Sequence, residues 1–143
     1  MNMGKFARAT FCNHYRAMSS HDTCEAGVRY DSFGQMPFNQ RPCFRKDANE
    51  PVRCGCDLVQ FPTAEEVAEA DAWLDERFAR TGKAREKIVE FCGGPWKRGD
   101  GGMSGTIDCP CCGAKDSLLF SRAGYNGHIH AVCMTEDCVN WME

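Results

Sequence analysis

Aliphatic side chains are scarce in the first part of the chain. Within residues 1–60, leucine, isoleucine and valine occur only at Val28, Val52, Leu58 and Val59. A segment with so few of them cannot bury a large hydrophobic core, so we expect disulfides or metal ions to stabilise it. The 143-residue chain contains 11 cysteines, which supply the side chains for either.

The sequence also lacks long hydrophobic runs. No segment approaches the roughly 18 consecutive apolar residues of a membrane-spanning helix. The opening residues, MNMGKFARATFCNHYRAMSS, contain no continuous apolar stretch of the kind that secretory signal peptides carry. A disulfide framework would leave a thiol unpaired, because the number of cysteines is odd. These features predict a cytoplasmic protein whose reduced cysteines bind metal.

An excess of positive charge is missing as well. The net charge is −3 and the isoelectric point is near 5.8. Residues 106–143 carry two Lys/Arg against five Asp/Glu, whereas residues 1–60 carry eight against six. The chain as a whole therefore has no electrostatic field that would attract nucleic acid.

The last part of the chain contains two pairs of closely spaced cysteines. The first pair lies in the turn sequence CPCCG, and the second pair follows after twenty intervening residues. The four residues are Cys109, Cys112, Cys133 and Cys138. Two thiolate pairs at the ends of a hairpin suit tetrahedral zinc. We therefore predict a zinc ribbon over residues 106–143, with disulfides as the alternative.

Two predicted strands, 117–122 and 128–133, lie between the cysteine pairs. Asn126-Gly127 favours a tight hairpin, because both residues tolerate positive φ. His128 and His130 fall on the polar face of the second strand. Since four cysteines complete the coordination of zinc, we expect the ion to be structural and neither histidine to be catalytic.

A second group of potential ligands lies in the turn-rich first sixty residues. They are Cys12, His14, Cys24, Cys43, Cys54 and Cys56. Their spacing matches no standard zinc finger. Three interpretations stay open: a second zinc site, an iron–sulfur cluster, or free and disulfide-bonded cysteines. We expect zinc on Cys12, Cys24, Cys43 and Cys56, with Cys54 or His14 as alternative ligands.

A long amphipathic helix is predicted over residues 63–92. Thr63 and Glu66 form a capping box at its start. Small or apolar residues then recur at three- and four-residue steps, as in an amphipathic helix. They are Val67, Ala70, Leu74, Phe78, Ala84, Ile88 and Phe91. Gly82 weakens the pattern, but one continuous helix is favoured over a helical hairpin.

Charge is segregated along this helix, with acidic residues first and basic residues later. Complementing the helix dipole explains the order, and a basic patch around Arg77 and Arg80 is the alternative. Trp73 is predicted to be either a core residue or an anchor for a partner.

Residues 93–105 are rich in glycine and read as a linker. Trp96, Lys97 and Arg98 within it form an aromatic and basic cluster. Such a cluster can stack on a nucleic-acid base and contact phosphate. We favour the other interpretation, in which Trp96 docks the linker on the protein.

Several motifs resemble a family of small cysteine-rich, zinc-ribbon-containing accessory proteins of bacteriophages and prophages. They are CNHY, DTCEAGVRY, CGCDLVQFPTAEE and, after CPCCG, RAGYNGHIHAVCMTEDCVNWME. The resemblance implies a protein of the host-cell cytoplasm that binds a host or defence component. It covers most of the chain.

Taken together, the sequence predicts a small, metal-stabilised α+β protein with four regions. These are a Cys/His-rich region at 1–62, the helix at 63–92, the linker at 93–105 and the zinc ribbon at 106–143. No nucleophile–base pair, phosphate loop or paired carboxylate motif is evident, so we expect a non-enzymatic protein that binds and modulates a host macromolecule. A nucleic-acid-binding module is the alternative, and an iron–sulfur or redox protein is less favoured.

Overall fold

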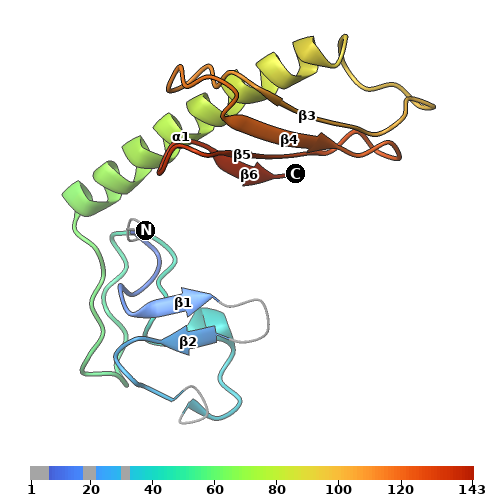
Figure 1. Cartoon of the computed structure of the whole chain (residues 1–143). Coiled ribbons are helices and arrows are strands. Elements are labelled where there is room, and N and C mark those ends of the chain that lie inside the picture. Colours follow the sequence, from blue (N-terminus) through green and yellow to red (C-terminus); the bar gives the residue numbers. More distant parts are fainter. Residues whose placement is uncertain (1–6, 18–21, 30–32) are drawn as a thin grey trace. The chain divides into compact units, whose positions relative to one another are not determined.

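The computed structural model describes residues 7–17, 22–29 and 33–143 (Figure 1). The chain divides into two compact units with a boundary between Trp73 and Leu74. Helix α1 (Ala64–Phe91) begins in the N-terminal unit and ends in the C-terminal unit. Within the described residues, no helix has both the length and the apolar character needed to cross a membrane.

The C-terminal unit contains a four-stranded antiparallel sheet in the order β3-β4-β5-β6. The strands are β3 (Met103–Ile107), β4 (Leu118–Arg122), β5 (Ile129–Cys133) and β6 (Asn140–Met142). Buried and exposed residues alternate along β4 and β5, so one face of the sheet is covered and the other meets solvent. Leu118 pairs with both Ile107 and Cys133, which places the core beside the cysteines.

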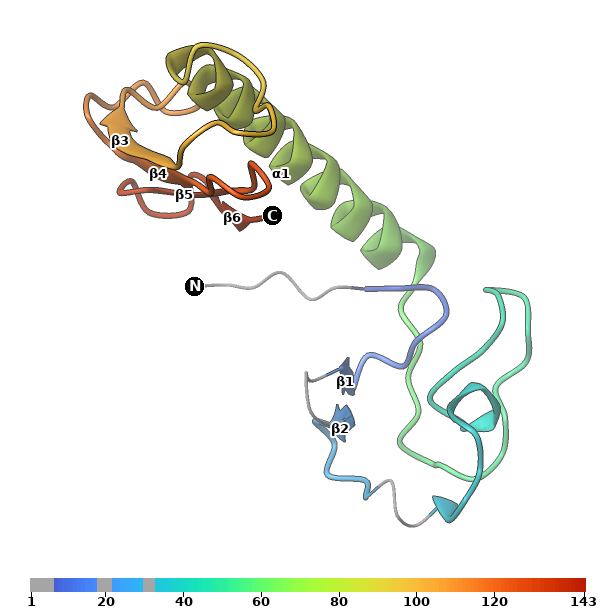
Figure 2. The ribbon, with the colours of Figure 1, turned by 90° about the vertical axis from the view of Figure 1, so that its right-hand side faces the viewer.

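The second half of α1 covers the buried face of this sheet (Figure 2). Ala84 and Ile88 lie one turn apart, are fully buried and pack in one cluster with Leu118 and Ile129. At the end of the helix, the Phe91 and Phe120 rings meet edge to face at 5.6 Å. The hydrophobic core of the described residues is therefore a helix packed on a sheet.

Gly105 makes room for that aromatic contact. A Cβ atom at this position would lie 3.1 Å from the Phe120 ring and 3.5 Å from the Phe91 ring. A side chain in β3 would displace one ring or the other. Gly105 is one of the six glycines that made residues 93–105 resemble a linker, and it is in fact a packing residue of the sheet.

The prediction of one continuous helix is confirmed, because α1 runs through Gly82 without a break. The capping box is also present. Thr63 N–H donates to Glu66 Oε2 at 2.8 Å, and Glu66 N–H donates to Thr63 Oγ1 at 3.2 Å. Gly93 and Gly94 adopt positive φ just after the helix and end it.

Only part of the apolar stripe of α1 is buried. Only Ala84 and Ile88 are buried, whereas Phe78 is 69% exposed and Phe91 is 55% exposed. The periodicity identified a helix with an apolar side, but it carried no information on how far the sheet extends along that side. Apolar packing on the sheet reaches only the last turns of the helix.

The boundary between linker and ribbon is also corrected. Met103–Gly105 belong to β3, so the linker is shorter than residues 93–105. The ribbon prediction contained two strands, and the structure adds β3 and β6 on either side of them. Neither flanking strand has a strong local signal, because β3 contains Ser104 and Gly105 and β6 has three residues.

The N-terminal unit consists mostly of turns and irregular chain, as its sequence predicts. Strands β1 (Tyr15–Ala17) and β2 (Asp22–Cys24) form a short antiparallel pair, and η2 (Phe38–Gln40) is a single 3-10 turn. In this unit, aromatic side chains pack together in place of aliphatic ones. The members of this aromatic cluster, with neighbouring centroids between 5.2 and 5.9 Å apart, are Phe11, Tyr15, Phe38 and Phe44.

We expect Ile88→Ala to destabilise the C-terminal unit by roughly 2–5 kcal/mol, because it leaves a cavity in a fully packed site. Phe78→Ala is the matched control on the same helix, and we expect it to change stability by less than about 0.5 kcal/mol. Urea unfolding of the full chain, with amide exchange of β4 and β5 as the local probe, measures both. Equal losses in the two variants would contradict the packing described.

Candidate metal centre

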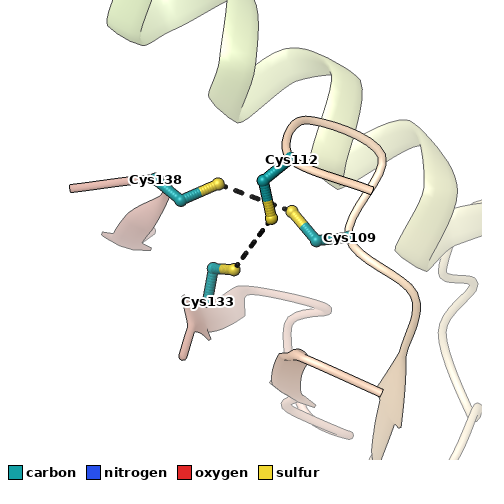
Figure 3. A group of neighbouring side chains, drawn as sticks. All are labelled: Cys109, Cys112, Cys133 and Cys138. Atoms are coloured by element: carbon teal, nitrogen blue, oxygen red, sulfur yellow. Dashed lines mark hydrogen bonds between the residues drawn. The ribbon is translucent and has the colours of Figure 1, made fainter. Parts of the chain in front are cut away.

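Two loops of the C-terminal unit bring the predicted cysteines together. Cys109 and Cys112 lie in the connection between β3 and β4, Cys133 ends β5, and Cys138 lies in the connection to β6. Figure 3 shows the four side chains pointing toward one another from these two loops. The sequence therefore identified the whole group correctly.

Each loop is a tight turn. In the first, Gly113 adopts a φ of 75° and its N–H donates to the Cys109 carbonyl at 2.8 Å. Glycine adopts this left-handed conformation without strain. In the second, Asp137 takes the corresponding left-handed φ of 56°, and Cys138 N–H donates to the Thr135 carbonyl at 3.3 Å. Both turns aim their cysteines at a common centre.

The distances between sulfurs fit a tetrahedral metal ion. All four sulfur atoms lie within 4.8 Å of one another. Cys109 and Cys138 are 3.6 Å apart at Sγ, and Cys112 and Cys133 are 3.7 Å apart. Sulfurs bound at about 2.3 Å around a tetrahedral ion would be separated by about 3.8 Å.

A disulfide does not fit the same distances, because its sulfurs are about 2.05 Å apart. All 11 cysteines lie in the described part of the chain, and all have free thiols. The disulfide alternative is therefore wrong for this structure. The four cysteines could hold a metal ion.

The centre is continuous with the hydrophobic core. Cys109 is 1% exposed and Cys133 is 7% exposed, and both belong to the cluster that contains Ile88 and Leu118. Cys112 faces solvent, and Cys138 is half-buried. One side of the centre is thus dry and packed, and the other side reaches the surface.

The surroundings of Cys112 and Cys138 shift the pKa values of these two thiols in opposite directions. The Thr135 hydroxyl and then the Ala114 N–H lower the pKa of Cys112 to about 6. Burial and the neighbouring thiols raise the pKa of Cys138. Four thiolates at this spacing repel one another strongly, so a cation is needed for all of them to ionise together.

Cys111 sits inside the first cysteine turn but does not belong to the group. Its Sγ donates to the Arg80 carbonyl at 3.3 Å, so it contacts the helix instead of the centre. His128 and His130 are both exposed and also lie outside the group. The sequence placed both histidines on the polar face of their strand, and their exposure agrees with that prediction.

The N-terminal candidates are arranged differently. Cys12, His14, Cys24, Cys43 and Cys56 line one small cavity. Their ligand atoms are less closely gathered, because only the C-terminal group meets the 4.8 Å spacing among the residues the structure describes.

Cys54 does not share this cavity. Its side chain is exposed, whereas Cys56, two residues later, lines the cavity wall. The structure thereby separates two cysteines that the sequence left as alternatives.

The two arginines predicted to bind a partner contact the chain's own carbonyl groups. Arg77 Nη2 donates to the Asn140 carbonyl at 3.3 Å. Arg80 Nη1 donates to the Asp137 carbonyl at 3.4 Å, and the same guanidinium pairs with Glu76. Arg77 therefore joins the helix to β6, and Arg80 joins it to the loop between β5 and β6.

The tryptophans and the linker cations have different environments. Trp73 is 36% exposed, and Lys97 and Arg98 are exposed. Trp96 is half-buried against the β4–β5 turn, where a Cβ on Gly127 would come within 2.6 Å of it. This places Trp96 as a docked residue of the linker, on the hairpin turn of its own unit.

Sequence reasoning missed two residues near these sites. Thr135 Oγ1 lies 3.4 Å from Cys112 Sγ, and nothing in its local sequence marks it as a partner of the first cysteine turn. Arg122 is 4% exposed, and its Nη1 donates to the Gly94 carbonyl at 3.0 Å. With Trp96, it lines a cavity of about 270 Å³ beside the β4–β5 turn. A buried arginine on a strand could be recognised only by where its strand packs.

Comparisons of the chain with protein-family models, with curated proteins and with solved structures found no match. The interpretation of the four-cysteine site therefore depends on its geometry alone.

We expect Cys112→Ser to lose the metal ion of this centre and to loosen residues 106–143, because such sites contribute folding free energy directly. Cys111→Ser is the matched control, since the adjacent thiol lies outside the group. Metal analysis of purified protein and amide exchange over β4 and β5 measure the two effects. Unchanged metal content in Cys112→Ser would contradict the assignment.

Proposed function

We propose that the four-cysteine centre binds zinc and that residues 106–143 form a zinc ribbon. Four thiolates in tetrahedral spacing are typical of structural zinc sites. The sulfur separations of 3.6 and 3.7 Å and the donors around Cys112 support this choice. The burial of Cys109 and Cys133 in the core supports a structural role for the ion.

We infer that such an ion is not catalytic. A catalytic zinc ion has three protein ligands and keeps one position for water or substrate, whereas this group supplies four. The donor set therefore favours a non-enzymatic protein. Function then depends on the surface that the ion holds in shape.

For that function, we propose a phage-type accessory protein that works in the host-cell cytoplasm. It would bind a protein of the host, of its defence or of its transcription machinery, and alter that protein's activity. The resemblance of the cysteine motifs to phage accessory proteins suggests the role. The acidic balance of residues 106–143 favours a protein over a phosphate backbone as the partner.

One structural observation favours protein binding over the alternative, nucleic-acid binding. The basic half of α1 is largely engaged with the chain's own acceptors. Arg77 and Arg80 donate to backbone carbonyls, Arg85 pairs with Glu143, and Lys87 pairs with Glu90. These contacts reduce the positive charge that remains available for phosphate.

The linker around Trp96 is the part of the chain that could still bind nucleic acid. Lys97 and Arg98 are exposed, but the Trp96 ring packs on Gly127 and would have to leave it to stack on a base. We therefore keep nucleic-acid binding as the second candidate. An iron–sulfur or redox protein built on the N-terminal cysteines has less support, because their sequence lacks the dense C-x₂-C-x₂-C run of many such clusters.

We expect the zinc-loaded protein not to retain single- or double-stranded DNA or RNA at physiological ionic strength. Fluorescence anisotropy with labelled oligonucleotides, between about 50 and 200 mM salt, measures this. Binding whose affinity falls steeply over that range would support the nucleic-acid alternative instead, because released counterions produce such a slope.

We also expect a specific bacterial protein to be retained by the immobilised chain and to bind again when purified. Arg98→Glu should weaken that binding about tenfold, equivalent to about 1.4 kcal/mol, if the exposed linker contacts the partner. Lys46→Glu, which changes an exposed residue by the same charge, is the control. Quantitative affinity purification followed by titration of the purified pair gives both values.

Absence of any retained protein in lysates of several bacterial hosts would overturn the proposal. If Arg98→Glu and Lys46→Glu weaken partner binding equally, the linker is not the contact site. Metal content, measured in parallel, shows whether either variant has disturbed the ribbon.

A further inference from the structure

Five side chains of the N-terminal unit that carry thiol or imidazole groups line one cavity. They come from four separate stretches of a unit with little regular structure. They are Cys12, His14, Cys24, Cys43 and Cys56. The remaining wall is aromatic or aliphatic and consists of Tyr15, Val28, Phe33, Leu58 and Val59. Thiols and an imidazole are therefore gathered in an apolar setting.

The size of this cavity limits what it can hold. Its volume is about 10 Å³, close to the space that a single water-sized sphere requires. One metal ion matches that size, whereas an iron–sulfur cluster or an organic cofactor is several atoms larger. The cavity thus favours a single ion.

Backbone hydrogen bonds hold the ligand-bearing stretches together. Cys12 N–H donates to the Cys43 carbonyl at 2.8 Å, and Glu25 N–H, next to Cys24, donates to the His14 carbonyl at 2.7 Å. In addition, Gln60 N–H donates to Cys12 Sγ at 3.3 Å. A backbone N–H directed at sulfur stabilises a thiolate, which is the form that binds metal.

The N-terminal unit has little else to stabilise it. Among its described residues, only Cys12, Pro42 and Pro62 are buried. The aromatic cluster around Phe11 lies beside the cavity, but no buried aliphatic core accompanies it. An ion bound by four cysteines from separate stretches would supply folding free energy that this composition cannot.

We infer that the N-terminal unit contains a second metal site, for one divalent ion of the zinc class. Its ligands are Cys12, Cys24, Cys43 and Cys56. His14 lies beside them on the cavity wall, and the exposed Cys54 is excluded. Because these sulfurs are less closely gathered than the C-terminal four, ion binding draws the loops inward. The inference stands apart from the proposed partner, since it uses only contacts within this unit.

The test counts zinc in the untagged full-length chain, purified under reducing conditions. We expect about two zinc ions per chain in the wild type and in Cys54→Ser, and about one in Cys43→Ser. Cys43→Ser combined with Cys112→Ser should bind almost none. Mass spectrometry of the metals, with protein concentration from amino-acid analysis, gives the ratios.

A wild type that binds about one zinc ion would overturn the inference, as would a Cys43→Ser variant that still binds about two. Iron with acid-labile sulfide, accompanied by visible absorption, would show that the site holds a cluster instead of a single ion. That result would also overturn the inference. If Cys43→Ser does not fold, zinc titration of the metal-free wild type tests the second site instead. The second equivalent should then protect amides within residues 7–62, and its absence would contradict the site.

Discussion

Four cysteine sulfurs within 4.8 Å of one another are the constraint on which the C-terminal unit depends. Their charges would repel if all four ionised, and burial resists ionisation further, so a cation between them would stabilise the arrangement. Because Cys109 and Cys133 also pack with Ile88 and Leu118, the metal centre and the hydrophobic core are one structure. Loss of an ion bound there would expose core residues, and loss of the core would separate the sulfurs.

The N-terminal unit meets a similar problem with different means. Its described residues include no buried aliphatic side chain, and aromatic rings, four cysteines and a histidine around one cavity occupy the place of a core. An ion in each unit would stabilise two small structures, neither of which buries much apolar surface. In the proposed function, such ions would stabilise the fold, and exposed side chains such as Arg98 in the linker would contact the partner.

Features that depend on neighbouring residues could be predicted from the sequence. The helix cap at Thr63 and Glu66, and the two cysteine turns, are formed by backbone and side-chain groups within a few residues of each other. Their chemistry is therefore visible in short motifs. The same locality explains why β3 and β6 were missed, since those strands are stabilised by pairing with β4 and β5 and not by their own composition.

By itself, then, the sequence determined the helix, the hairpin and the four cysteines of the C-terminal centre, because spacing along the chain encodes them. Only the tertiary structure decided how much of the apolar side of α1 is buried, that Trp96 rests on Gly127, and that Cys56 lines the N-terminal cavity while Cys54 does not. Each of these depends on contacts between residues far apart in the chain. Such contacts arise from packing and space, which local periodicity does not specify.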